Sequence, residues 1–216
     1  MAKESKRAQG GDKEARLLMA VLEPLAAALT DGKTARTVEF APEDLRIVRQ
    51  LQLLTSKPVL YVCNVGEEDA AEGNHHSQAV EELAKREGAS SILISAAIEA
   101  EIAALPTEED KQDFLETLGL EETGLARLIR QGYGLLDLLT FFTAGPKEAR
   151  AWTVRTGSTA PQAAGAIHTD FERGFIRAET IAYDDFIASG GEAGAKDAGK
   201  LRVEGKDYIT KDGDIY

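Results

Sequence analysis

Two short polar segments close apolar runs of the chain and are the clearest candidates for chemistry. Asn64-Val65-Gly66-Glu67 ends the run at residues 58–65, and Ser95-Ala96-Ala97 ends the run at residues 91–96. Ligands of open α/β sheets bind beyond the carboxyl ends of the strands, where an asparagine can order the loop backbone and a later residue can face a base edge. About thirty residues separate the segments, as a strand–helix–strand unit requires. Together they predict a base-recognition site.

The residue at position 67 bears on which base is recognised. In the GTPase pattern this residue is aspartate, whose carboxylate accepts two hydrogen bonds from guanine. Glu67 is longer and misplaced for guanine. Ser95 and Ala96 stand where the second, short base-contacting turn is expected. The pattern therefore indicates a base-recognition loop altered from the guanine type.

Other motifs in the chain do not carry catalysis or metal binding. Gly32-Lys33-Thr34 lacks the glycine that a phosphate-cradling P-loop needs at position 27, which is Ala27, and it follows a helical segment. His75-His76 has Glu72 nearby but no suitably spaced third ligand, so a surface loop is the better interpretation. Cys63 lies in an apolar run and is interpreted as a core residue. We assign no catalytic residue and no metal ligand.

The N-terminal elements form a helical hairpin. Helices are predicted at residues 2–8 and 13–29, on either side of Gly10-Gly11, with Asp12 as the cap of the second helix. The first helix is about two turns long and too short to be stable alone. We therefore expect the chain to lack upstream material.

The middle of the chain alternates strands and helices. Strands at 58–65 and 91–96 are predicted to be parallel and buried, and the predicted helices cover residues 42–54, 77–86, 107–118 and 125–138. This alternation is typical of half of a doubly wound α/β sheet. Two parallel strands do not make a stable sheet, which again points to missing material.

The last part of the chain predicts a separate α+β module of about 75 residues. A hairpin of residues 140–144 and 149–154 surrounds a Gly145-Pro146 turn. It is followed by a helix at 160–168, a strand at 174–181, a helix at 183–188 and a strand at 207–210. We expect the aromatic residues here to form the core, namely Trp152, His168, Phe171 and Phe175.

Charge is spread unevenly along the 216 residues. The net charge is −12, yet residues 64–122 hold 16 acidic residues against Lys85, Arg86 and Lys111, which leaves about +1 for the rest. The flanking regions are therefore neutral to mildly basic and could meet nucleic acid. The lone Cys63 excludes an internal disulfide and suits a reducing compartment. The sequence contains no run of about 20 uncharged apolar residues, so we predict no membrane partner.

Several longer segments resemble the YchF/Obg-like family of P-loop ATPases, also called EngD. Gly10-Gly11-Asp12-Lys13 is similar to the tip of the family's inserted helical arm. The C-terminal segments resemble its TGS module: Phe142-Thr143-Ala144-Gly145, Arg150-Ala151-Trp152-Thr153, Ala160-Pro161-Gln162-Ala163-Ala164-Gly165, residues 167–178 (IHTDFERGFIRA), Glu204-Gly205-Lys206-Asp207-Tyr208-Ile209 and Asp212-Gly213-Asp214.

The resemblance implies a fold class of α/β plus α+β: a partial P-loop NTPase domain with a helical hairpin arm, followed by a ubiquitin-like TGS domain. Residues 1–40 would be part of the arm, 41–138 the C-terminal part of the Obg-type nucleotide domain, and 139–216 the TGS domain. The family's P-loop and switch regions have no counterpart here, so we expect a fragment that begins inside the arm. The complete protein would hydrolyse ATP in preference to GTP with Mg²⁺, whose ligands this chain lacks.

The resemblance also assigns roles to matching positions. Asn64, Val65 and Glu67 match the family's altered base-recognition loop, which is tied to adenine preference, and Val65 would lie against the base partly through its backbone. Ser95 and Ala96 match the second base-side loop. ATP is the implied cofactor. We predict that this chain alone neither binds ATP tightly nor hydrolyses it, because the phosphate cradle and metal supply most of the stabilisation in phosphoryl transfer.

The implied partner is the ribosome in the cytoplasm, through ribosomal RNA or protein of its large subunit. The arm and TGS module would dock there through basic residues, which are Lys6, Arg7, Arg150, Arg155, Arg173 and Arg177. The alternative interpretation of those arginines is plain solubility. The alternative function is a stand-alone TGS-containing RNA- or ribosome-binding module without catalytic activity.

Overall fold

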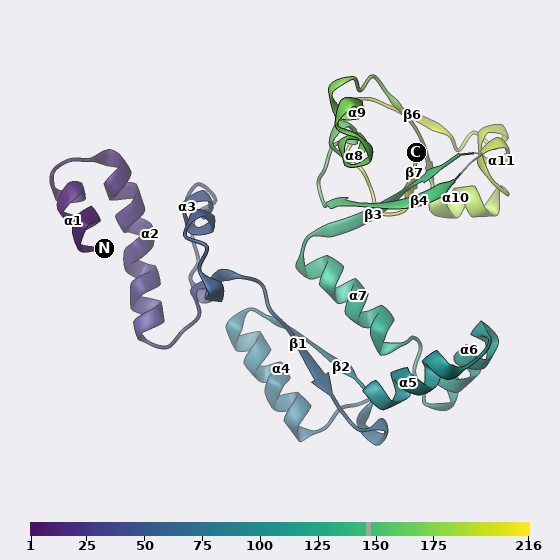
Figure 1. Cartoon of the computed structure of the whole chain (residues 1–216), viewed down its shortest axis with the longest axis horizontal. Helices are drawn as coiled ribbons and strands as arrows, with labels where there is room; N and C mark the ends of the chain where they lie inside the picture. The colour runs from purple at the N-terminus through teal and green to yellow at the C-terminus, as the bar shows by residue number, and fades with distance from the viewer. Residues whose placement is uncertain (146–147) are drawn as a thin grey trace. The chain divides into compact units, whose positions relative to one another are not determined.

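A computed structural model of the chain describes residues 1–145 and 148–216 (Figure 1). The chain divides into two compact units, Met1–Ile129 and Arg130–Tyr216. The division falls inside helix α7, Gly124–Leu135. Among the described residues, none of the helices is long and apolar enough to cross a membrane.

The first unit begins with the predicted helical hairpin. Helices α1 (Ala2–Gln9) and α2 (Lys13–Thr30) pack against each other around the Gly10-Gly11 turn. The Asp12 carboxylate accepts hydrogen bonds from the backbone N–H groups of Glu14 and Ala15, at 3.0 and 3.1 Å. This side-chain cap satisfies two amides of the first turn and fixes where α2 begins. The predicted hairpin is confirmed.

The hairpin is held at its base by an apolar cluster. Val21 and Leu25 of α2 are buried with Ala35, and partly buried side chains pack against them, namely Val38, Phe40, Ile47, Val48, Leu51 and Leu53. Ala35 belongs to the 3₁₀ turn η1 (Ala35–Thr37), and Ile47 and Val48 belong to helix α3 (Leu45–Gln50). Leu53 directly precedes a second 3₁₀ turn, η2 (Leu54–Ser56).

The predicted helix at 42–54 is wrong in length, because α3 covers only Leu45–Gln50. Gln52 has φ of 48°, a left-handed conformation that no right-handed helix can include. The helix must therefore end before it. The acidic residues before Leu45 lie in a turn instead of in the helix.

Strands β1 (Leu60–Asn64) and β2 (Ser90–Ile94) pair in parallel, with Asn64 opposite Ile94. Helix α4 (His75–Glu87) connects them, and the 3₁₀ turn η3 (Glu67–Asp69) precedes it. The parallel β-α-β unit is confirmed. The predicted burial is wrong, since Ile92 is the only fully buried residue among those of the two strands and Val62 is 44% exposed.

Three helices follow β2: α5 (Ala96–Ala104), α6 (Glu108–Thr117) and α7. They confirm the helices predicted near 107–118 and 125–138, although α7 ends at Leu135. The predicted strand at 91–96 ran two residues too far, because Ser95 is the N-cap of α5. Ile98 and Ile102 of α5 are buried with Leu115 of α6, so this unpredicted helix forms a core of its own.

The second unit is built on a five-stranded sheet with the order β4-β3-β7-β5-β6. Strands β3 (Leu138–Ala144) and β4 (Ala149–Arg155) are antiparallel, with Phe141 opposite Trp152, so the predicted hairpin is confirmed. Pro146 and Lys147 of its turn lie outside the described residues. Leu139, Phe141, Val154 and Ala163 form the buried core of this unit.

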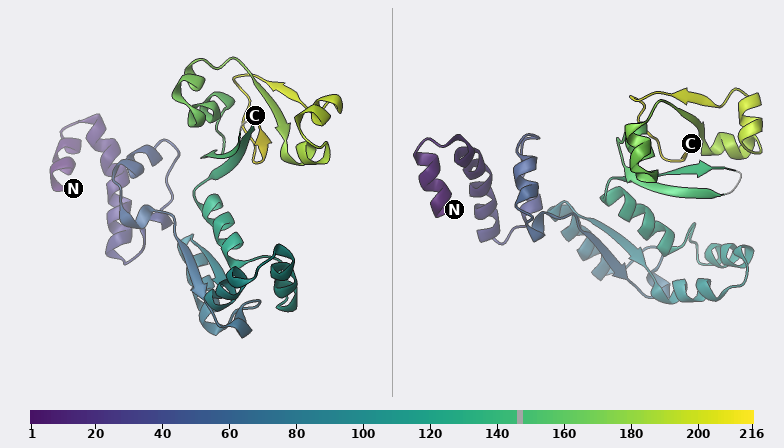
Figure 2. Two further views of the ribbon diagram at one scale, coloured as in Figure 1. Left: turned by 45° about the vertical axis from the view of Figure 1, so that its right-hand side comes forward. Right: turned by 45° about the horizontal axis from the view of Figure 1, so that its top comes forward.

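The remaining elements lie in two groups. Helices α8 (Ala160–Ile167) and α9 (Thr169–Arg173) lie at one end of the unit, and α10 (Tyr183–Ala188) and α11 (Glu192–Asp197) at the other (Figures 1 and 2). Strands β5 (Ala178–Ala182), β6 (Arg202–Glu204) and β7 (Asp214–Ile215) complete the sheet. The helices at 160–168 and 183–188 are confirmed. The strand predicted at 174–181 begins only at Ala178.

The strand predicted at 207–210 is wrong. Ile209 is 47% exposed and makes only an isolated bridge with Thr159. The position inside the sheet belongs instead to the two-residue β7, whose Ile215 lies between Phe142 of β3 and Ile181 of β5.

The predicted aromatic core is half right. Phe175 is buried and Trp152 packs against the core cluster. Phe171 is 54% exposed and the His168 side chain 60% exposed, so neither is a core residue. His168 caps the short helix α9 instead, since its Nδ1 accepts a hydrogen bond from the backbone N–H of Asp170 at 3.2 Å.

Candidate functional site

The two base-side segments meet at the carboxyl ends of β1 and β2. The Asn64 Oδ1 atom accepts a hydrogen bond from the backbone N–H of Ala96 at 3.0 Å. The N–H of Val65 donates to the carbonyl of Ile94 at 2.9 Å, which extends the pairing of the two strands. The sequence prediction that these segments lie together is therefore correct in geometry, and Asn64 is the residue that joins them.

These bonds determine which groups stay available to a ligand. Because the N–H of Val65 and the N–H of Ala96 already donate within the protein, Val65 can meet a base only through its side chain and carbonyl. Glu67 is exposed at the first position of η3. Its carboxylate is an acceptor that faces solvent and is open to a donor on a base.

Ser95 supplies an unusual polar group at this edge. The residue is 4% exposed, and its Oγ has no hydrogen-bond partner among the residues that the structure describes. A buried hydroxyl without a partner costs free energy unless a ligand or water satisfies it. The Ser95 hydroxyl is enclosed by protein, so Ser95 shapes this edge without offering its hydroxyl to a ligand.

A second layer of contacts holds the loop that follows Asn64. Asn74 caps helix α4 by accepting from the N–H groups of His76 and Ser77, at 3.0 and 3.1 Å, and its Nδ2 donates to Asp69 at 2.7 Å. Gly73 has φ of +74°, which a side chain would strain. Sequence reasoning missed this layer, although an asparagine three residues before Ser77 is a helix-start signal.

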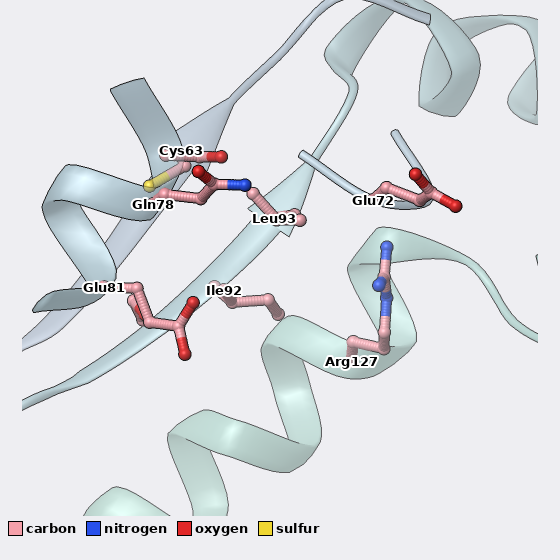
Figure 3. Close-up of a pocket in the computed structure, with 9 residues that line it drawn as sticks. Cys63, Glu72, Gln78, Glu81, Ile92, Leu93 and Arg127 are labelled. Carbon is pink, nitrogen blue, oxygen red and sulfur yellow. The ribbon is translucent and has the colours of Figure 1, made fainter. Parts of the chain in front are cut away.

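The site lies beside two hollows in the first unit. One, of about 330 Å³, is lined by residues 61–64 of β1, by Val65 after it, and by Asn74, His76, Ser77 and Val80. The other, of about 300 Å³, is shown in Figure 3, where Arg127 extends from α7 toward Glu72, and Cys63, Gln78 and Glu81 lie on the other side. Cys63 and Ser77 border both hollows, so β1 and α4 form the wall that separates them.

The first unit also contains a polar link between the hairpin base and β1. Arg36 forms an ion pair with Glu87 at the end of α4, and its Nε donates to the Glu87 carbonyl at 3.2 Å. Tyr61 of β1 donates to the same carboxylate at 2.9 Å. The hydrogen bonds from Tyr61 and Arg36 lower the pKa of Glu87, and the pKa of Tyr61 is raised.

Within the described part of the chain, no group of three or more histidine, cysteine and acidic side chains is placed to hold a metal ion. The six basic candidates lie on separate elements of the two units. Lys6 and Arg7 lie on α1, and Arg150 and Arg155 lie on the edge strand β4. Arg173 is the last residue of α9, and Arg177 directly precedes β5. Two strands, β3 and β7, separate β4 from β5 in the sheet.

The environments of these cations also differ. Arg7 pairs with Glu4 at 2.9 Å and with Asp12 at 2.7 Å, so its charge is largely used inside the hairpin. Arg150 stacks over the ring of Trp152, with 4.2 Å from its guanidinium carbon to the ring centroid. Both arginines remain exposed. Arg150 therefore presents a flat cation–aromatic surface, which the sequence pattern did not predict.

A parallel β-α-β unit, joined to a separate five-stranded α+β unit, defines a mixed α/β protein. Residues 138–216 match the YchF-GTPase_C family, described as a protein of unknown function (DUF933).

Curated relatives match nearly the whole chain. "Ribosome-binding ATPase YchF" of Haemophilus influenzae is 54% identical over 97% of this chain and 57% of its own length. The protein of the same name from Bacillus subtilis is 53% identical over 98% of this chain and 58% of its own length. The chain is therefore homologous to the YchF family, and it spans a little over half of the length of these relatives.

Solved structures agree with this assignment. The Schizosaccharomyces pombe YchF GTPase covers 94% of this chain with a TM-score of 0.81 and 33% identity, and the match covers 55% of that protein. A GTP binding protein from Pyrococcus horikoshii, with a TM-score of 0.51 and 19% identity, covers 93% of this chain and is matched over 55% of its own length. It shares the fold.

Proposed function

We propose that this chain is the C-terminal part of a ribosome-associated P-loop nucleotide hydrolase that uses ATP in preference to GTP. The names of its relatives support ribosome binding and nucleotide hydrolysis. The hydrogen bond between Asn64 and Ala96 carries the assignment of the site, because it ties the two base-side loops to each other at one sheet edge. In this proposal residues 1–40 belong to the arm, 41–138 to the nucleotide domain and 139–216 to a TGS domain.

The chemistry of the edge accounts for the base preference. Glu67 takes the place of the aspartate that would bind guanine, and its longer side chain reaches a different position. Val65 would pack against the base and can offer it a carbonyl acceptor, which the exocyclic amino group of adenine can use and the carbonyl of guanine cannot. Ser95 and Ala96 would form the second base-side loop, which the bond from Ala96 to Asn64 holds beside the first.

The residues of this chain recognise and orient a base; they do not perform phosphoryl transfer. The 216 residues contain no G-x-x-x-x-G-K-[ST] sequence. Mg²⁺ bound with the nucleotide phosphates supplies most of the charge stabilisation in such reactions. We therefore expect this chain alone to bind Mg-ATP more weakly than the micromolar range and to release no phosphate.

Isothermal titration with Mg-ATP tests this directly. A chain extended upstream to include a G-x-x-x-x-G-K-[ST] segment should bind Mg-ATP more tightly than Mg-GTP, and the 216-residue chain should bind neither tightly. In the extended chain, Glu67→Asp should shift preference toward GTP, and Glu68→Asp serves as the matched control. Micromolar binding of Mg-ATP by the 216-residue chain would contradict the proposal, as would an unchanged preference in Glu67→Asp.

Docking to the ribosome is tested by co-sedimentation with large subunits. We expect the chain to sediment with them at low salt and to be lost steeply as salt rises, because contacts to phosphates release counterions. Neutralising Lys6, Arg7, Arg173 and Arg177 together should weaken co-sedimentation. Neutralising Lys33, Lys85, Lys111 and Lys196 instead is the control with the same change in charge. Equal sedimentation of the two variants would rule out docking by the basic flanks.

The second candidate is a TGS-containing module that binds RNA or ribosomes and has no catalytic role. The specific observation in its favour is the separate second unit, with Arg150 stacked on Trp152 at its surface. The two candidates differ in the extended chain. ATP hydrolysis by that chain favours the hydrolase, whereas ribosome binding without any nucleotide effect favours the module. The cytoplasm suits both, since ribosomes are the proposed partner.

A further inference from the structure

The second unit carries an open hollow of about 520 Å³ on the sheet face opposite its core. Phe141 of β3 is fully buried, so its neighbour Phe142 points to the other face. There the Phe142 ring lies 5.8 Å from the ring of Tyr183, at an angle of 38°. Asp184 and Asp212 also line this hollow. Two aromatic rings and two carboxylates thus border one space.

The floor of this hollow is fixed by hydrogen bonds between segments distant in sequence. The N–H of Thr140 donates to the Asp212 carboxylate at 2.8 Å, and the N–H of Gly213 donates to the Thr140 carbonyl at 2.9 Å. The N–H of Tyr183 donates to the Gly213 carbonyl at 2.9 Å. Strand β3, the turn before β7 and the start of α10 are therefore held in one arrangement, and a ligand would meet a preformed surface.

The charges on this face select the kind of partner. Asp184 and Asp212 are exposed, and neither belongs to an ion pair formed among the residues that the structure describes. The neighbouring Asp185 differs, since it pairs with Lys200 at 3.1 Å. Two carboxylates outside any ion pair among the described residues repel the phosphates of nucleic acid. Aromatic faces beside them attract a planar cation, which stacks on a ring and forms hydrogen bonds to carboxylates at the same time.

We propose that this hollow is a docking site for an arginine side chain on a basic, extended protein segment. The guanidinium group stacks on the exposed ring of Tyr183, which packs against Phe142, and pairs with Asp184, while the Asp212 carboxylate adds to the negative potential. The second unit then has two chemically different surfaces: arginines on β4 and before β5 that suit anions, and this acidic–aromatic face that suits cationic polypeptide. This inference is independent of the proposed nucleotide hydrolysis.

Fluorescence anisotropy with the full 216-residue chain provides the test. The probe is a fluorescein-labelled peptide of alternating arginine and glycine, and a peptide of alternating glutamate and glycine is the charge control. We expect the arginine peptide to bind and the glutamate peptide not to bind. Tyr183→Ala and Asp184→Asn should each weaken binding about threefold to fivefold, and the double variant about tenfold.

Matched variants separate the hollow from the general acidity of the chain. Asp185→Asn removes the same charge one residue away and should leave the affinity unchanged, because Asp185 already pairs with Lys200. Tyr183→Phe keeps the ring and should also bind. If Tyr183→Ala does not fold, Asp184→Asn against Asp185→Asn decides alone, since Asp184 is exposed. The proposal is overturned if the arginine peptide does not bind, or if Asp184→Asn and Asp185→Asn behave alike.

Discussion

The two strand pairs β1–β2 and β3–β4 are stabilised in different ways. The parallel pair contains a single fully buried residue, Ile92, and Val62 at its centre is 44% exposed. The antiparallel pair buries Leu139, Phe141 and Val154 in one continuous core. The hydrophobic effect therefore holds the second pair together. The first pair depends more on hydrogen bonds at its ends, such as the one from Ala96 to Asn64.

The first unit places most of its buried apolar residues away from the strands. One cluster lies between α5 and α6, with Ile98, Ile102 and Leu115, and another lies at the base of the hairpin. The loops that could recognise a base are thus set between two separate cores. Substitutions in these loops should therefore change the free energy of unfolding little, whereas substitutions in the core of the second unit should change it strongly.

The largest expected effect is in the second unit. Phe141→Ala should lower its free energy of unfolding by about 3–5 kcal/mol, because it leaves a cavity in a fully buried position. Trp152, the single tryptophan, packs against this core and reports on it by fluorescence during urea unfolding. Val62→Ala should lower the free energy of unfolding of the first unit by less than about 1 kcal/mol, as measured by far-UV circular dichroism during urea unfolding. Similar costs for the two variants would refute the contrast.

The next effect concerns the start of α7. The Glu99 carboxylate accepts hydrogen bonds from the N–H of Gly124 at 2.6 Å and of Leu125 at 3.2 Å. Glu99→Ala leaves these amides without their acceptor and should cost about 1–3 kcal/mol. Hydrogen exchange at residues 124 and 125 measures it. Glu101→Ala, an exposed acid on the same helix, is the control, and equal exchange in both variants would contradict the role of Glu99.

A smaller effect depends on pH. Tyr208 donates to the buried Asp214 at 2.8 Å, and burial together with this hydrogen bond raises the pKa of Tyr208 from 10 to about 12. Because its folded pKa is the higher one, the stabilisation is complete below pH 10 and is lost as the pH rises toward 12. Tyr208→Phe should cost about 1 kcal/mol at neutral pH and flatten this alkaline loss.

Urea titrations of the second unit between neutral and alkaline pH, followed by Trp152 fluorescence, measure this slope. Some slope should remain in Tyr208→Phe, since burial also raises the pKa of Tyr216. An equally steep alkaline loss in the wild type and in Tyr208→Phe would show that Tyr208 is not its source.

The smallest effect on global stability is expected at the base-side edge. Asn64→Ala removes one exposed hydrogen bond, so the free energy of unfolding should fall by less than about 1 kcal/mol. The amide of Ala96 should nevertheless exchange faster. Asn64→Asp keeps an oxygen acceptor and should preserve the protection. Equal exchange of Ala96 in the wild type and in Asn64→Ala would break the proposed link between the loops.

Local signals in the sequence were sufficient for much of the fold. Asp12 as a cap, the glycine turn before it and the apolar runs around 60 and 92 predicted the hairpin and the parallel unit correctly. Asn64 and Ala96 were also predicted to lie together, since both follow strands of one β-α-β unit. In each case the determining interaction lies within the segment or between elements adjacent in the chain.

The sequence predictions failed where an element depends on partners distant in sequence, or where no residue signals its start. Helix α5 was missed because Ser95 makes no side-chain cap and an alanine-rich segment continues directly from β2. Strand β7 has only two residues, and its pairing with β3 and β5 depends on partners far along the chain. The orphan hydroxyl of Ser95 and the partners of Arg7 likewise become visible only in three dimensions.

Arg36 bonds to two separate segments and therefore holds the base of the hairpin at more than one point. The Arg36 guanidinium donates hydrogen bonds to the carbonyl of Thr55 and to the carbonyl of Glu87, and it pairs with the Glu87 carboxylate. The same Glu87 carboxylate accepts a hydrogen bond from Tyr61, three residues before Asn64 on strand β1. A displacement of the hairpin base would therefore also displace strand β1, because one arginine connects the two through Glu87.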